Sequence, residues 1–154
     1  MINVEHIHPM LVHFPITLLL LAVLIDFQVL TRKQDLAATG CLPSSGFYVL
    51  LLAAVAAIAA ATFGDIALDK AMELGFDKAP LEEHEELGFA TLWIMLGLAG
   101  WQSLARWRGM RLGGAIGWLF FALALVGSVV LLAAAYHGGE LVYALGVNVA
   151  PVHP

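Results

Sequence analysis

The chain has 154 residues, of which 61% are hydrophobic and 12% are charged, and its formal net charge is −5. Soluble globular domains carry about 25% charged residues, so this composition excludes the ordinary class of water-soluble enzymes. The single Cys41 excludes an internal disulfide, and the absence of a Cys-x-x-Cys-His motif excludes covalently attached c-type haem. The composition is that of an integral membrane protein.

Four apolar runs are long enough to cross a bilayer as helices, since a span needs about 20 mostly apolar residues. They cover residues 10–30, 47–68, 87–107 and 113–136. We therefore expect an all-α, up-down-up-down four-helix bundle that forms a single transmembrane domain over residues 1–154. The N-terminus has no basic segment and its apolar run has full span length, so we expect the first helix to be retained rather than cleaved as a signal peptide.

Basic residues indicate the orientation of the bundle, because cytoplasmic loops are enriched in Lys and Arg. Five of the seven fall after the first helix or between the third and fourth: Arg32, Lys33, Arg106, Arg108 and Arg111. Both termini would then lie on the outer, periplasmic side of a bacterial inner membrane. All six histidines and most carboxylates fall on that side too.

Two residues of the first helix stand out. Asp26 lies within the apolar run, and because an intramembrane carboxylate needs a partner, we expect it to pair with Arg106 or Arg108. Pro15 removes a backbone donor early in the helix and should kink it locally.

Four histidines are predicted at the outer helix ends: His8 and His13 on the first helix, His84 on the third and His137 on the fourth. At about 100° per residue His8 and His13 are roughly 140° apart around a regular helix. They would therefore serve different sites, or only one would bind a cofactor directly. Two carboxylates, Asp65 and Glu140, are expected nearby.

One interpretation of this cluster is a haem b site, because neutral imidazole is an axial ligand of haem iron and helical bundles hold such cofactors between facing helices. Gly88, Gly138 and Gly139 would make room for the flat macrocycle. Asp65 and Glu140 would accept hydrogen bonds from the outer nitrogens of the ligating rings. Since every histidine is on one side, one haem or two side by side fit better than a chain of haems across the membrane.

A second interpretation uses the same four histidines, with Asp65 or Glu140, to bind zinc, copper or non-haem iron. No HExxH or similar motif supports it. A third is that the imidazoles and carboxylates simply hydrogen-bond to one another and to water.

Four segments carry a family resemblance: HPMLVHFPITLLL from His8, Gly64-Asp65, HEELGFATL from His84 and HGGELVYALGV from His137. They resemble a prokaryotic family of small four-helix membrane proteins known only as a domain of unknown function. Members are sometimes fused to Rieske or c-type cytochrome domains, and the resemblance therefore implies a redox setting and favours haem. The resemblance implies that the four histidines form the site, with Asp65 and Glu140 next to them as hydrogen-bond acceptors.

We therefore expect a transmembrane b-type cytochrome that transfers electrons rather than turning over a substrate. The first ligand candidates are His13, His84 and His137, followed by His8. Expected partners are the lipid bilayer and a quinone or a periplasmic redox protein; a homo-oligomer is left open, and the acidic outer face disfavours nucleic acid. The alternatives are a non-haem metal-binding protein and an accessory subunit of a respiratory complex.

Overall fold

The computed structural model describes residues 7–149, and over that range it contains helices joined by short loops. In chain order the helices are α1 (Ile7–Leu11), α2 (His13–Thr31), α3 (Cys41–Glu73), α4 (Lys78–Arg108) and α5 (Gly114–Tyr143). Four stretches are long and apolar enough to cross a membrane, with α1 and α2 counted together as the first. The predicted all-α bundle with four spanning helices is confirmed.

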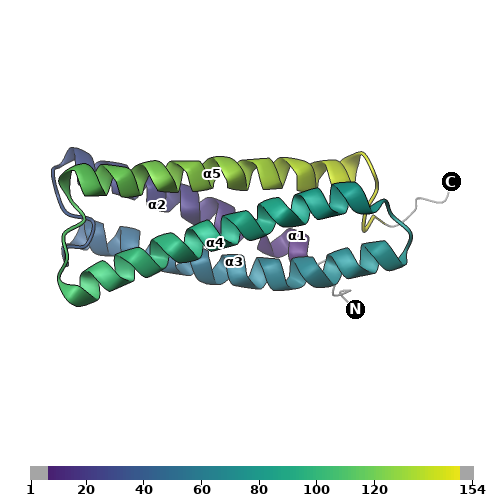
Figure 1. The fold of residues 1–154 in the computed structure, drawn as a ribbon, viewed down its shortest axis with the longest axis horizontal. Coiled ribbons are helices and arrows are strands. Elements are labelled where there is room, and N and C mark those ends of the chain that lie inside the picture. The colour runs from purple at the N-terminus through teal and green to yellow at the C-terminus, as the bar shows by residue number, and fades with distance from the viewer. Residues whose placement is uncertain (1–6, 150–154) are drawn as a thin grey trace.

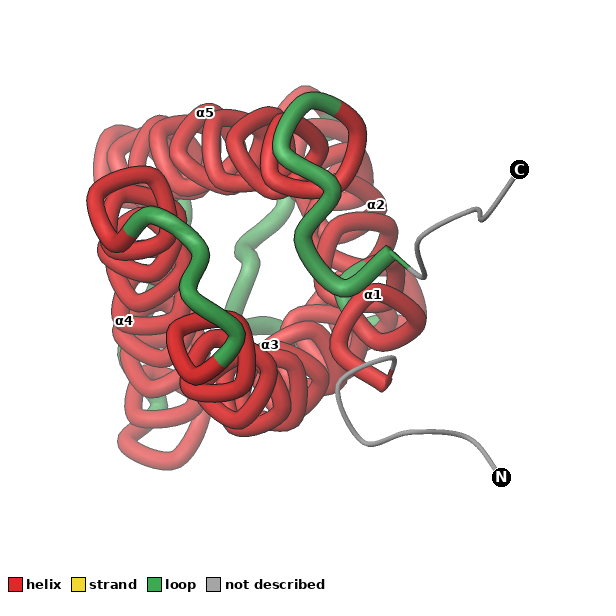
Figure 2. The backbone as a smooth tube through the Cα atoms, turned by 90° about the vertical axis from the view of Figure 1, so that its right-hand side faces the viewer, coloured by secondary structure: helices red, strands yellow, loops and turns green. Residues whose placement is uncertain are grey.

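The helices form an antiparallel bundle in which neighbours in the chain are neighbours in space (Figure 1). α3 packs between α2 and α4, and α5 packs between α4 and α2, so α2 and α4 occupy opposite corners of the square seen in Figure 2. The short α1 lies at the corner of α2 and contacts α3. Side chains from α1 and α4 can therefore meet only by reaching across the bundle.

The first spanning helix is interrupted at Val12, which separates α1 from α2. The cause is Pro15, whose nitrogen has no hydrogen to donate to the carbonyl of Leu11 four residues earlier. The local disturbance predicted from Pro15 is thus present, and it allows His8 and His13 to take independent directions.

The helices are longer than the apolar runs that revealed them. α3 has 33 residues, about 50 Å at 1.5 Å per residue, whereas the hydrocarbon core is about 30 Å thick. The ends that carry Asp69 to Glu86 therefore extend beyond the apolar run, with ion pairs such as Lys78 Nζ to Glu82 Oε1 at 2.7 Å on the helix surface. We call this the histidine end, because it carries His8 and His84, and we call the opposite end, which carries Arg32, the basic end.

The two loops of the basic end are locked together by Asp35. Its Oδ1 accepts hydrogen bonds from the backbone N–H groups of Ala37 and Leu112, both at 2.8 Å. Gln102 adds a bond from Nε2 to the carbonyl of Leu36 at 2.9 Å. This end of the bundle is a rigid base.

The ion pair expected for Asp26 is wrong. Asp26 is buried against Gly46 and, within residues 7–149, it has neither a hydrogen bond nor an ion pair. Arg106 turns away to donate from Nη2 to Ser44 Oγ at 2.9 Å and to lie over the Phe47 ring. Arg106 and Asp26 do not pair because they face different parts of the bundle. Arg106 contacts the first turns of α3, while Asp26 points into the closely packed contact between α2 and α3.

Two hydrophobic clusters fill the bundle. The larger occupies most of its length around Phe120, Leu50 and Met95. The smaller lies at the tip of the histidine end and contains Ala71, Leu81, Leu141 and Val147. Between the two clusters is a polar layer that contains His8 and His84.

Candidate functional site

His8 projects from α1 onto the backbone of α3. Its Nδ1 lies 2.8 Å from the carbonyl oxygen of Ala60. That carbonyl is accessible because the residue four positions later, whose side chain would cover the turn, is Gly64. A Cβ at Gly64 would lie 3.0 Å from both Cε1 and Nδ1 of His8. The glycine therefore provides the space that the imidazole occupies.

His84 repeats this arrangement in the other half of the chain. From α4 its Nδ1 lies 3.0 Å from the carbonyl oxygen of Ala134 on α5. Again the residue four positions later is a glycine, Gly138, and a Cβ there would lie 2.9 Å from Cε1 of His84. Gly138 thus accommodates an imidazole directly, rather than leaving the open space expected from the sequence.

The two halves of the chain are structural repeats at this site. Each half is a pair of helices, and in each a histidine near the start of the first helix binds the carbonyl of an Ala-x-x-x-Gly segment near the end of the second. The histidine and its carbonyl are 52 residues apart in the first half and 50 in the second. This repeat is visible in the sequence, but composition and apolar periodicity do not reveal it.

The two imidazoles meet in the middle of the bundle. The ring centroids of His8 and His84 are 6.0 Å apart, and the ring planes are inclined by 76°. Each Nδ1 faces a carbonyl oxygen, which only accepts hydrogen bonds, so each Nδ1 must carry the proton. In the neutral rings both Nε2 atoms then have free lone pairs, and within the described residues neither makes a hydrogen bond.

His137 lies beside this pair but has different neighbours. Its Nδ1 is 3.6 Å from Glu140 Oε2, and its Nε2 is 3.9 Å from Glu83 Oε1. Both nitrogens of His137 therefore face carboxylates, whereas His8 and His84 face backbone carbonyls. The predicted proximity of Glu140 to a histidine is present, but the histidine is His137.

Other candidates from the sequence lie outside the pair. His13 is exposed on the outer face of α2 beside Phe14 and Thr17, because it follows the break at Val12. Asp65 is exposed on α3, and the acceptor for the imidazole N–H is a backbone carbonyl instead of the expected carboxylate. Gly88 and Gly139 have no atom within 4 Å of the Cβ positions they lack. His6 and His153 lie outside the described residues.

The histidine pair lies near the end of the apolar part of the bundle. Counting about 20 residues, the thickness of the hydrocarbon core, from the basic end reaches Ala61 on α3, Gly88 on α4 and Ala134 on α5. The imidazoles bind the carbonyls of Ala60 and Ala134, so they lie close to that level. Between Ile7 and Val149 no three His, Cys, Asp or Glu side chains converge on one metal ion, so these two imidazoles are the core of the site.

Comparison with known proteins gives a family and no further relatives. The sequence model of a family described as "Predicted membrane protein (DUF2231)" matches residues 5–151. No curated protein and no solved structure matches the chain.

Proposed function

The chain belongs to the DUF2231 family of predicted membrane proteins, and from this premise we propose that it is a b-type cytochrome whose haem iron is bound by His8 and His84. The observation that carries the proposal is the pair of imidazoles, held by two backbone carbonyls with both Nε2 lone pairs free. The ligand set differs from the one that sequence reasoning placed first, because His8 replaces His13 and His137.

The spacing of the rings suits two ligands on one metal. An imidazole nitrogen binds a metal at about 2.0 Å, and adding about 1 Å from each nitrogen to its ring centre puts two opposed imidazoles roughly 6 Å apart. The centroid distance between His8 and His84 is 6.0 Å. The separation of the two ring centres therefore matches the value expected for two imidazoles on one metal.

The number of ligands favours haem over a bare metal ion. Structural zinc takes four protein ligands and catalytic zinc takes three, whereas the residues described here offer no group of three. Haem iron needs only two axial ligands, since the macrocycle supplies the other four. Gly88, one turn from His84, has no atom within 4 Å of the Cβ that it lacks, so no side chain is packed against that position.

A bound haem would supply one-electron chemistry, and the residues of the chain would set its properties. The carbonyls of Ala60 and Ala134 hold the ring orientations and raise the basicity of the Nε2 atoms, as hydrogen-bond acceptors do for metal-bound histidine. If His8 and His84 both bound the iron, no position would remain open for a substrate, and the haem would supply electron transfer rather than substrate turnover.

We further propose that the histidine end faces the periplasm of a bacterial inner membrane. The support is the concentration of Arg32, Lys33, Arg106, Arg108 and Arg111 at the basic end, which fits a cytoplasmic location. An electron partner would then bind outside the membrane or within its outer leaflet.

Four alanine variants test the ligand assignment. The purified protein is reconstituted with haem, and the visible spectrum is recorded oxidised and reduced. We expect His8→Ala and His84→Ala each to abolish the six-coordinate low-spin spectrum, and His13→Ala to leave it unchanged, with His137→Ala retaining low-spin haem. Loss of the low-spin spectrum in His13→Ala but not in His8→Ala would refute the pair.

The two alternative functions give different results in the same experiment. If the purified protein is colourless and binds zinc or copper stoichiometrically, the same histidines form a metal-ion site and not a haem site. A protein that binds neither, and tolerates His8→Ala together with His84→Ala without loss of stability, would favour an accessory subunit.

A further inference from the structure

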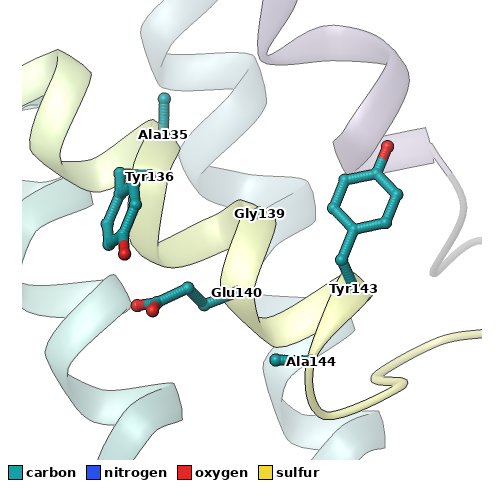
Figure 3. A pocket seen from close by; sticks show the side chains of 6 residues that line it. All are labelled: Ala135, Tyr136, Gly139, Glu140, Tyr143 and Ala144. Atoms are coloured by element: carbon teal, nitrogen blue, oxygen red, sulfur yellow. The ribbon is translucent and has the colours of Figure 1, made fainter.

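A shallow open depression lies on the outside of α5, at the depth of the histidine pair. It has a volume of about 440 Å³ and is lined by Ala135, Tyr136, Gly139, Glu140, Tyr143 and Ala144. Figure 3 shows the Tyr136 hydroxyl and the Glu140 carboxylate turned toward each other on one side of Gly139, with the Tyr143 ring on the other side. The floor is Gly139, where a side chain would meet no atom within 4 Å.

The depression and the histidine pair share one short piece of helix. At about 100° per residue Tyr143 is roughly 180° from Ala134, so the depression is on the opposite face of α5 from His84. His137 connects the two faces, since its ring packs edge-on against Tyr136 at 5.7 Å between centroids and its Nδ1 is 3.6 Å from Glu140. A molecule in the depression is therefore about one helix diameter from the proposed haem.

We propose that this depression binds the headgroup of a membrane hydroquinone, which would be the electron donor to the haem. Its position on a lipid-facing surface near the interface is reached by a hydrophobic molecule from within the bilayer. The Tyr136 hydroxyl donates to the Glu140 carboxylate. The carboxylate keeps free lone pairs, which can accept a second hydrogen bond from a ring hydroxyl of the hydroquinone. The rings of Tyr136 and Tyr143 flank a flat aromatic ligand above Gly139.

The reaction that this site would serve is balanced by a one-electron acceptor outside the protein. One hydroquinone loses two electrons and two protons and becomes a quinone. A bound haem would supply the one-electron chemistry, two molecules of a soluble iron–sulfur or haem protein would take up one electron each, and the two protons would enter the aqueous phase at the histidine end. This electron path rests on the proposed haem, whereas binding of the headgroup rests only on the residues of α5.

Photolabelling tests the binding site without relying on activity. The purified protein is irradiated with a short-chain azidobenzoquinone, and labelled peptides are identified by mass spectrometry. We expect labelling within residues 135–144 that an excess of unlabelled short-chain benzoquinone prevents. Glu140→Gln should weaken competition about tenfold, because it removes a charged hydrogen-bond acceptor.

A glycine pair provides the matched control. Gly139→Leu fills the floor of the depression and should abolish the label. Gly97→Leu adds the same side chain to an exposed, equally open position on α4 and should leave the label unchanged. Labelling elsewhere, labelling that survives Gly139→Leu, or labelling that added phospholipid prevents as well as benzoquinone does would overturn the proposal, the last by identifying a lipid site.

The experiment is run on protein with and without haem, so that the two proposals fail separately. A protein that binds no haem but is labelled in the depression would refute the cytochrome and retain the quinone site. A low-spin cytochrome that is not labelled in the depression would retain the haem proposal and refute the quinone site.

Discussion

Gly64 and Gly138 should be the least replaceable glycines at the histidine end, because each holds the place of an imidazole. In Gly138→Ala the new Cβ would lie 2.9 Å from Cε1 of His84, and in Gly64→Ala it would lie 3.0 Å from two atoms of His8. The contact at Gly138 is shorter than real Cβ atoms show, so the His84 ring must move, whereas at Gly64 the His8 ring must shift by a few tenths of an ångström.

The expected loss of stability follows from two opposed effects. Overpacking a closely packed site costs about 1–3 kcal/mol. Replacing glycine by alanine in a helix interior gains about 0.5–1 kcal/mol. The net result for Gly138→Ala is a decrease of about 0–2.5 kcal/mol in the free energy of unfolding, with the middle of the range near 1 kcal/mol. Gly64→Ala should lie toward the lower end of that range, because its contacts are slightly longer.

Gly139→Ala and Gly88→Ala are the matched controls, since no atom lies within 4 Å of the added Cβ at either position. Both should raise the free energy of unfolding by about 0.5–1 kcal/mol through helix propensity alone. Thermal unfolding of all four variants in one detergent, followed by circular dichroism, separates the two pairs by sign. If Gly138→Ala is as stable as Gly139→Ala, the packing of His84 against α5 is refuted.

Other variants test the rest of the structure. Asp26→Asn should raise thermal stability, because a buried carboxyl without a partner is replaced by an uncharged group of equal size. A lower melting temperature would show that the carboxyl has a hydrogen-bonding or charged partner, which would contradict the structure around Gly46. Asp35→Ala should lower the free energy of unfolding by about 1–3 kcal/mol, since it leaves the N–H of buried Leu112 without an acceptor. Arg111→Ala, which removes only an exposed ion pair to Asp35, should cost under about 1 kcal/mol in the same unfolding assay; an equal cost for both would refute the role of the backbone hydrogen bonds.

The sequence predicts the architecture well because the requirement that produces it is local. Each backbone polar group in lipid must be satisfied within its own helix, so apolar length alone reveals four spans. Apolar length does not reveal where the helices end. Beyond the apolar runs, α3 and α4 remain helical in polar segments that carry ion pairs such as Lys70 with Glu73. Hydropathy does not measure that contribution.

The site is predicted less completely, because it depends on backbone geometry. The sequence places four histidines at one end, but it does not show that Pro15 turns His13 outward and leaves His8 facing inward. Nor does it show that the hydrogen-bond acceptors are the carbonyls of Ala60 and Ala134 rather than carboxylates, since every residue has a carbonyl. The recurring glycine four residues after each alanine is the signal that would have identified them.

The central claim is tested most directly by the haem content and spin state of the wild-type protein purified from membranes of haem-sufficient cells. We predict one non-covalent haem b per chain, with a Soret band that sharpens on reduction, resolved α and β bands, and no change on addition of carbon monoxide, because the proposed ligands His8 and His84 would leave no position on the iron for carbon monoxide. A preparation without haem, or a high-spin haem that binds carbon monoxide, would contradict the account.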